Sequence, residues 1–130
     1  MNYGLARSGQ WEEVEAEIRA VVNAAHARNV IVKVIFEASQ LTAEEIARAT
    51  EISIAAGADF VKTATGFFGT GATAEQLQIM LDTARGRCKV KASGGIRDYA
   101  TAKAFLEMGV ERLGIGSSSV PKILAEEAKS

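Results

Sequence analysis

The feature that most constrains the fold of this chain is a lysine that recurs at a fixed spacing inside short apolar segments. Lys33, Lys62 and Lys91 follow one another at intervals of 29 residues, in the segments VIVKVIF, DFVKTAT and CKVKASGG. Each segment is typical of a β-strand, where a charged amine is not expected unless it lies at a sheet edge, is paired or is neutral. Recurrence at the same position of successive units favours a pocket lined by three lysines in register over three unrelated edge residues.

Helical patterns alternate with these strands. Residues 11–28 place apolar side chains at three- and four-residue steps after an acidic first turn, which predicts an amphipathic helix. Thr42 with Glu45 predicts a capping box for a helix that Gly57 ends. Further helices are expected from Thr73 or Ala74 to about Arg85, from Asp98 to about Met108, and with Pro121 in the first turn of the last one. Strands are expected at residues 30–36, 60–64, 88–92 and 112–116.

The order is therefore one helix followed by four strand–helix units, which predicts a parallel sheet with right-handed crossovers. The strands are apolar on both faces, so we expect the sheet to be covered on both sides. With 130 residues, of which 48% are hydrophobic and 24% charged, the chain is expected to form one soluble globular domain over residues 1–130.

Composition excludes several functional classes. A net charge of −1, with lysine and arginine scattered along the chain, gives no electrostatic basis for binding nucleic acid or an anionic membrane. Cys88 is the single cysteine and is expected to be a small buried residue, and His26, without Cys or His partners, is expected on a helix surface. We therefore expect no metal and no cofactor. The sequence shows neither a long apolar span nor an apolar leader, which predicts a cytoplasmic protein.

Each strand runs into a loop rich in Gly, Ser and Thr. These loops are residues 62–66 with 69–71, residues 93–95 and residues 114–119. Ligands of parallel α/β sheets bind at the carboxyl ends of the strands, where small residues allow close approach and helix N-termini favour anions. The last two loops therefore predict a phosphate site.

A lysine in an apolar strand is also suited to forming an imine with a carbonyl substrate. The amine must be neutral to attack, so its pKa must fall from about 10.4 in water. Desolvation and a second ammonium within about 4–6 Å both lower the pKa. Lys62 and Lys91, on adjacent strands, are the candidates for such a pair.

Four ordered segments carry a resemblance to a known family: KVIFE at 33–37, DFVKTATGF at 59–67, GAT at 71–73 and VKASGGIR at 90–97. They resemble deoxyribose-phosphate aldolases, class I Schiff-base aldolases with a TIM-barrel fold, over essentially the whole chain. The resemblance implies reversible cleavage of 2-deoxy-D-ribose 5-phosphate to glyceraldehyde 3-phosphate and acetaldehyde. Lys62 would form the imine, Lys91 would lower its pKa and Lys33 would lie near the substrate hydroxyls. The residues implied near the phosphate are Thr65, Gly94, Gly95, Gly116, Ser117 and Ser118.

The chain departs from the family pattern in two respects. The segment RLGIGSSS places Gly116 where the family usually has a serine. The family closes eight strands, whereas this chain resembles the C-terminal half, so the expected fold is an α/β TIM half-barrel of about four strands. The aspartate that the family carries on its fourth strand would fall before Met1. Glu37, at a strand end, is a candidate acid to face the pocket in its place, but a salt bridge or a solvated rim position is the expected role.

A half-barrel leaves two open sheet edges and an inner face that we expect to be apolar, which favours association. A homo-oligomer, such as two copies closing one barrel about a two-fold axis, is therefore expected. Two alternatives to an active aldolase stay open at this point. One is a weak or inactive half-barrel scaffold that oligomerises, and the other is a module that binds a phosphate ligand.

Overall fold

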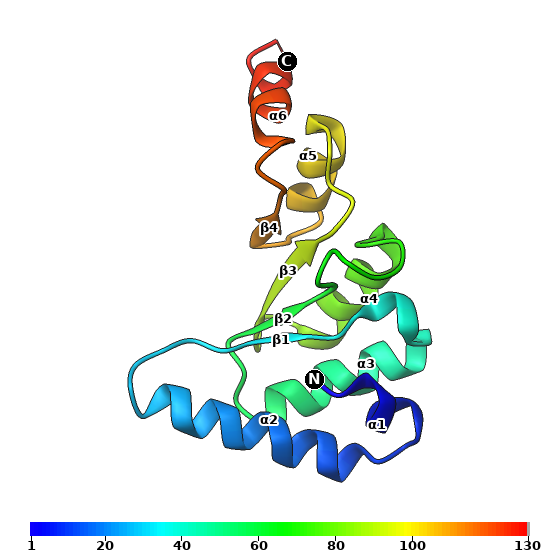
Figure 1. Cartoon of the computed structure of the whole chain (residues 1–130), viewed down its shortest axis with the longest axis vertical. Helices are drawn as coiled ribbons and strands as arrows, with labels where there is room; N and C mark the ends of the chain where they lie inside the picture. Colours follow the sequence, from blue (N-terminus) through cyan, green and yellow to red (C-terminus); the bar gives the residue numbers. More distant parts are fainter. Residues whose placement is uncertain (130) are drawn as a thin grey trace.

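The structure, a computed structural model, describes residues 1–129 as one parallel four-stranded sheet with helices (Figure 1). The sheet order is β1-β2-β3-β4, from β1 (Lys33–Ile35), β2 (Phe60–Lys62), β3 (Lys89–Ser93) and β4 (Arg112–Gly114). The helices are α1 (Tyr3–Arg7), α2 (Trp11–His26), η1 (Ala38–Gln40), α3 (Ala43–Ala55), α4 (Ala74–Ala84), α5 (Tyr99–Glu107) and α6 (Val120–Glu127). The four predicted strand–helix units are confirmed. β1, β2 and β4 are shorter than expected, β3 has the expected length but begins one residue later, and α1 and η1 were not predicted.

The helix starts follow the predicted capping chemistry. The Thr42 hydroxyl accepts from the Glu45 amide at 3.2 Å, and the Glu45 carboxylate accepts from the Thr42 amide at 2.8 Å. The Asp98 carboxylate caps α5 by accepting from the Thr101 amide, and Pro121 lies in the first turn of α6. Gly57, with φ of 90°, follows α3 in the left-handed conformation that favours glycine. Local sequence signals therefore determine where these helices begin and end.

One face of the sheet packs against the helices and forms the core. Val34, Val61 and Val90 lie side by side on this face and are buried. In Figure 1 the helices lie below, to the right of and above the strands. The buried helical side chains that complete the core include Val14, Ile18, Val22, Ile46, Leu77, Met80, Ala102 and Phe105.

The opposite face, which we call the open face, is cationic. Register and alternation place on it Lys33, Phe60, Lys62, Lys89, Lys91 and Arg112. Phe60 is only 5% exposed because three cations lie over its ring. The Lys33 and Lys89 amines are 5.4 and 5.8 Å from the ring centroid, and the Arg112 guanidinium is 5.0 Å from it. The expectations of an apolar inner face and of a sheet covered on both sides were therefore wrong.

The three lysines share this face but not one level of it. Lys62 is directly paired with Lys91, as predicted, whereas Lys33 is paired with Phe60, two residues before Lys62. Lys33 begins β1 and Lys62 ends β2, so an equal spacing in sequence does not give an equal height in the sheet. The prediction of three lysines in register holds only for the pair.

At the amino ends of the strands, Asp59 joins three segments. Its Oδ2 accepts from the Val32 amide at 2.7 Å and lies 2.9 Å from His26 Nε2. Hydrogen bonds from His26 and Val32 lower the pKa of Asp59. His26 is exposed, as predicted, but it connects the end of α2 to the sheet. Cys88 is buried, also as predicted, and burial raises the pKa of its thiol.

Candidate active site

A cavity of about 430 Å³ lies where β2, β3 and β4 end and their loops begin. Lys62 and Lys91 line it together, as the direct pairing of β2 with β3 requires. The other lining residues are Thr65, Gly66, Phe67, Ser93, Gly94, Gly95, Ile96, Arg97, Gly114, Ile115, Gly116, Ser118 and Ser119. The cavity therefore combines an amine pair with the glycine- and serine-rich loops that the sequence singled out.

The charge of Lys62 acts on the Lys91 amine beside it. Burial is the main cause of a lowered pKa for Lys91, and the positive charges of Lys62, Lys33 and Arg112 lower it further. None of the ion pairs found among residues 1–129 includes Lys62 or Lys91. A lysine with a lowered pKa can exchange a proton with bound groups closer to neutral pH than a surface lysine can.

Gly114 provides the space that the Lys91 side chain occupies. A Cβ at position 114 would lie 3.2 Å from Cε of Lys91 and 2.7 Å from Oγ of Ser93. Because Gly114 has no side chain, the aliphatic part of the Lys91 side chain can lie against β4 at this position. This contribution of Gly114 was not recognised in the sequence, because a glycine in a strand–loop junction is explained equally well by turn geometry.

The loops after β2 and β3 meet through glycine. A Cβ at Gly71 would lie 2.5 Å from the carbonyl carbon of Gly94, and the Ala72 amide donates to the Gly94 oxygen at 3.1 Å. Gly94 and Gly95 both have positive φ, at 88° and 77°. Only glycine fits this backbone contact, so these residues shape the cavity wall whatever ligand it takes.

The structure places most of the predicted site residues together. Of the predicted set, the cavity lining contains Lys62, Lys91, Thr65, Gly94, Gly95, Gly116 and Ser118. Lys33 and Ser117 are not among the lining residues. Phe67, Arg97 and Ser119 also line the cavity, although no role for them was predicted; Phe67 is 90% exposed. Their membership in the segments 59–67, 90–97 and 114–119 was the signal that could have indicated them.

Glu37 differs from its sequence-based interpretation. It is 4% exposed, and its carboxylate accepts hydrogen bonds from Thr65, at 2.6 Å from the hydroxyl and at 3.2 and 3.3 Å from the amide. None of the ion pairs among residues 1–129 includes it. The expectation of a salt bridge or a solvated rim position was wrong, because Thr65 satisfies the carboxylate in place of water or a cation.

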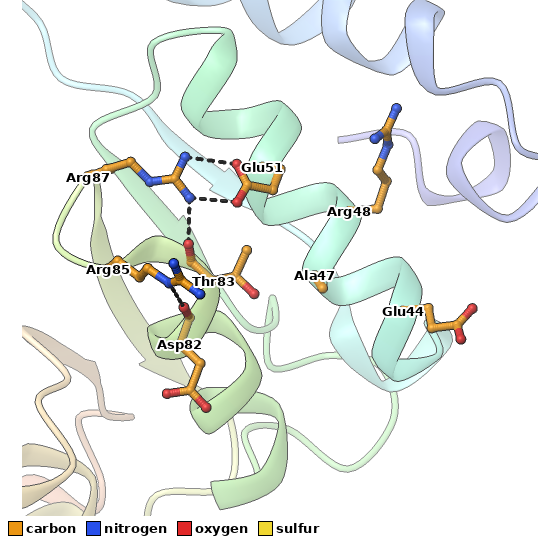
Figure 2. A pocket seen from close by; sticks show the side chains of 8 residues that line it. All are labelled: Glu44, Ala47, Arg48, Glu51, Asp82, Thr83, Arg85 and Arg87. Atoms are coloured by element: carbon orange, nitrogen blue, oxygen red, sulfur yellow. Dashed lines mark hydrogen bonds and ion pairs between the residues drawn. The ribbon is translucent and has the colours of Figure 1, made fainter.

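A second hollow, of about 1000 Å³, lies between α3 and α4 and contains none of the strand lysines. Figure 2 shows that Arg87 forms a two-pronged pair with Glu51 and also donates to the Thr83 carbonyl, while Arg85 donates to the Asp82 carbonyl. Arg85, Arg87 and Glu51 are thus engaged with local partners. Residues 1–129 contain no group of three His, Cys, Asp or Glu residues arranged to hold a metal ion, and no helix long and apolar enough to cross a membrane.

Comparison with known proteins gives a consistent set of relatives. A deoxyribose-phosphate aldolase of Exiguobacterium sibiricum is 50% identical over 114 residues, covering 88% of this chain and 51% of the relative. One from Klebsiella pneumoniae is 43% identical over 126 residues, covering 97% and 50%. The solved tetrameric deoxyribose phosphate aldolase of Aeropyrum pernix superposes with a TM-score of 0.82 at 32% identity, over 91% of this chain and 50% of that one.

The chain therefore spans about half the length of the curated relatives that it matches. The family model described as DeoC/LacD family aldolase matches residues 1–117. Together with the paired lysines and the half-barrel topology, this match shows that the chain belongs to the DeoC/LacD aldolase family.

Proposed function

We propose that this chain carries the imine-forming half of a class I aldolase site and acts on 2-deoxy-D-ribose 5-phosphate. Lys62 would be the nucleophile and Lys91 the neighbour that tunes it. The observation that carries the proposal is the direct pairing of Lys62 with Lys91 in one cavity walled by glycine loops. Phosphosugar-cleaving relatives of the same family, named deoxyribose-phosphate aldolases, support the choice of substrate.

The proposed reaction begins when the neutral Lys62 amine attacks the substrate aldehyde; the carbinolamine hydroxyl that forms then takes up a proton and leaves as water, which gives an iminium ion. The bond between C2 and C3 then breaks, its electrons pass to the iminium nitrogen and the C3 hydroxyl loses its proton, releasing glyceraldehyde 3-phosphate. The resulting enamine takes a proton at C2, and water releases acetaldehyde and restores the amine. Lys91 is suited to donating and accepting the protons of these steps because its pKa is lowered.

The glycine loops after β3 and β4 are proposed to hold the phosphate. Backbone amides of Gly94 and Gly95, with the hydroxyls of Ser117 and Ser118 and the backbone at Gly116, offer donors that suit an anion in the loop after β3 and at the start of α6. Lys33 is proposed to act near the substrate hydroxyls, but it lies two residues lower on the open face. Of all these assignments, that of Lys33 has the least geometric support.

Borohydride trapping tests the proposal. Substrate plus borohydride should leave a reduced adduct on Lys62 that peptide mass spectrometry locates, and Lys62→Leu should abolish it. Lys89→Leu is the matched control, because it removes a lysine from the same face that does not line the cavity. No adduct on the wild-type chain at high protein concentration, or an adduct that persists in Lys62→Leu, would contradict the proposal.

A half-barrel without useful turnover is the rival reading. It is favoured by one observation: among residues 1–129, no Asp or Glu lines the cavity that holds Lys62 and Lys91. An acid–base group that is absent costs roughly 10²–10⁴ in rate. Trapping of the imine without measurable cleavage of 2-deoxyribose 5-phosphate would distinguish this case from an active aldolase.

The expectation of a homo-oligomer is retained as a proposal, in a changed form. Two copies closing one barrel would bring two cationic open faces together, and like charges at such distances repel. We therefore expect self-association to use the outer, helical surface. The tetramer of Aeropyrum pernix shows that a relative does associate. Sedimentation at several salt concentrations tests this, and the cytoplasmic location expected from the sequence stays a prediction.

A further inference from the structure

Glu37 is a buried acid beside the cavity that the proposed reaction does not use. It follows β1 directly and has φ of 55° and ψ of 56°, a left-handed conformation that few residues other than glycine adopt. It is 4% exposed, and no ion pair found among residues 1–129 includes it. A buried carboxylate in an unusual backbone conformation needs compensating hydrogen bonds to persist.

Thr65 supplies all of the side-chain hydrogen bonds recorded for this carboxylate. Its amide donates to both oxygens, at 3.2 and 3.3 Å, and its hydroxyl donates to Oε2 at 2.6 Å. The hydroxyl oxygen in turn accepts from the Phe67 amide at 3.3 Å. Threonine has one hydroxyl hydrogen and one amide hydrogen, so both of its donors face Glu37. Thr65 has no donor left for a phosphate, and the carboxylate beside it would repel one.

These bonds restrain residues 65–67 of the loop that joins β2 to α4, residues 63–73. Thr63, the first residue of the loop, is held instead by hydrogen bonds between its hydroxyl and the backbone of Ser93. The second half is held separately, where Gly71 packs on Gly94 and the Ala72 amide bonds to the Gly94 oxygen. The first half follows Lys62 directly and carries Phe67 into the cavity lining. The loop is thus anchored to the segment after β1 on one side and to the segment after β3 on the other.

We propose that Glu37 is a positioning residue that acts through Thr65 to hold residues 65–67 of loop 63–73 beside Lys62. Thr65 serves this anchor and is not a phosphate ligand. The expected effect of Glu37 on imine formation at Lys62 rests on the proposed function, whereas the anchoring of the loop through Thr65 does not. A binding role expected for Thr65 from the family resemblance is thereby reassigned to the loops after β3 and β4.

Amide hydrogen exchange tests the anchor without any need for activity. In Glu37→Gln the amide group cannot accept all three bonds, so exchange at the Thr65 and Phe67 amides should accelerate by roughly tenfold or more, while Ala72 keeps its protection. Glu44→Gln, the same change at an exposed acid, should alter none of them. Thr65 exchange in a folded Glu37→Gln variant that equals the wild-type rate would overturn the proposal.

Two Thr65 variants keep the test decisive if Glu37→Gln does not fold. Thr65→Val removes the hydroxyl and should speed exchange of the Phe67 amide by about tenfold. Thr65→Ser keeps the hydroxyl and should leave this exchange at the wild-type rate. An unchanged rate at Phe67 in Thr65→Val would refute the relay from Glu37 to the loop.

Imine trapping with acetaldehyde, which carries no phosphate, measures the effect on Lys62 alone. Glu37→Gln and Thr65→Val should slow trapping roughly tenfold, and Thr65→Ser should leave it near the wild-type rate. Inorganic phosphate should bind Thr65→Val within about twofold of wild type; weakening by about tenfold or more would show that Thr65 is a ligand after all. Failure of the wild-type chain to form an adduct would sink the proposed function, while the exchange rates would still decide whether Glu37 anchors the loop.

Discussion

Substitution of Gly114 by alanine is the sharpest test of how tightly β3 and β4 pack beneath the cavity. The added Cβ would lie 2.7 Å from Oγ and 3.0 Å from Cβ of Ser93, and 3.2 Å from Cε of Lys91. Ser93 is 6% exposed and its Cβ moves only with the backbone, so the strands must separate. Overpacking of this kind costs about 1–3 kcal/mol in free energy of unfolding.

Gly116→Ala is the matched control, because it makes the same change two residues later. Its new Cβ would meet nothing nearer than Oγ of Ser118 at 4.0 Å, and its backbone is not in the left-handed region. Alanine there should stabilise the chain by about 0.4–1 kcal/mol by restricting the unfolded state. The two variants should therefore differ in opposite directions from wild type.

Urea denaturation followed by circular dichroism measures both free energies. Gly114→Ala should also slow imine trapping at Lys62, because the added methyl group displaces the Lys91 side chain and so moves its amine relative to Lys62. Equal stability of the two variants would refute the reasoning, since the contact at Ser93 would then not restrain the sheet. Loss of stability without any change in trapping would show that Lys91 keeps its place by other contacts.

Three further outcomes follow from the pKa directions and burial. Lys62→Met should raise the pKa of the Lys91 amine only part of the way, because burial remains its largest cause; NMR titration of the lysine side chain measures this, and no rise would contradict coupling. Asp59→Asn should lower the free energy of unfolding by about 1 kcal/mol at neutral pH. Because the pKa of Asp59 is lower in the folded than in the unfolded chain, its stabilising effect is present above the unfolded pKa and is lost as the pH falls through the folded pKa, so the difference should fade on acidification. A pH-independent difference would be inconsistent with this. Cys88 should react slowly with a thiol reagent in the native chain and quickly in urea, and equal rates would contradict its burial.

Local rules predicted the elements well because their signals are local. The capping residues Thr42, Thr73 and Asp98 begin helices where the sequence placed them, and Gly57 follows the end of α3. The pairing of Lys62 with Lys91 was also predictable, since β2 and β3 keep the same phase over 29 residues. These conclusions needed only periodicity, capping chemistry and the alternation of strands with helices.

Tertiary details were not available from the same patterns. Lys33 pairs with Phe60, because the register between two strands depends on the conformation of the segment that connects them and not on its number of residues. The cationic character of the open face was hidden for the same reason, since Lys89 and Arg112 join it only through register. The bond from Thr65 to Glu37 links two segments 28 residues apart and has no signature in either one.

The open face gives the chain an uneven distribution of charge. Lys33, Lys62, Lys89, Lys91 and Arg112 are five of the fifteen basic residues, so ten remain elsewhere against sixteen acids. The rest of the molecule therefore carries an excess of negative charge. The open face should attract anions and the remaining surface should repel them, and salt should weaken both effects.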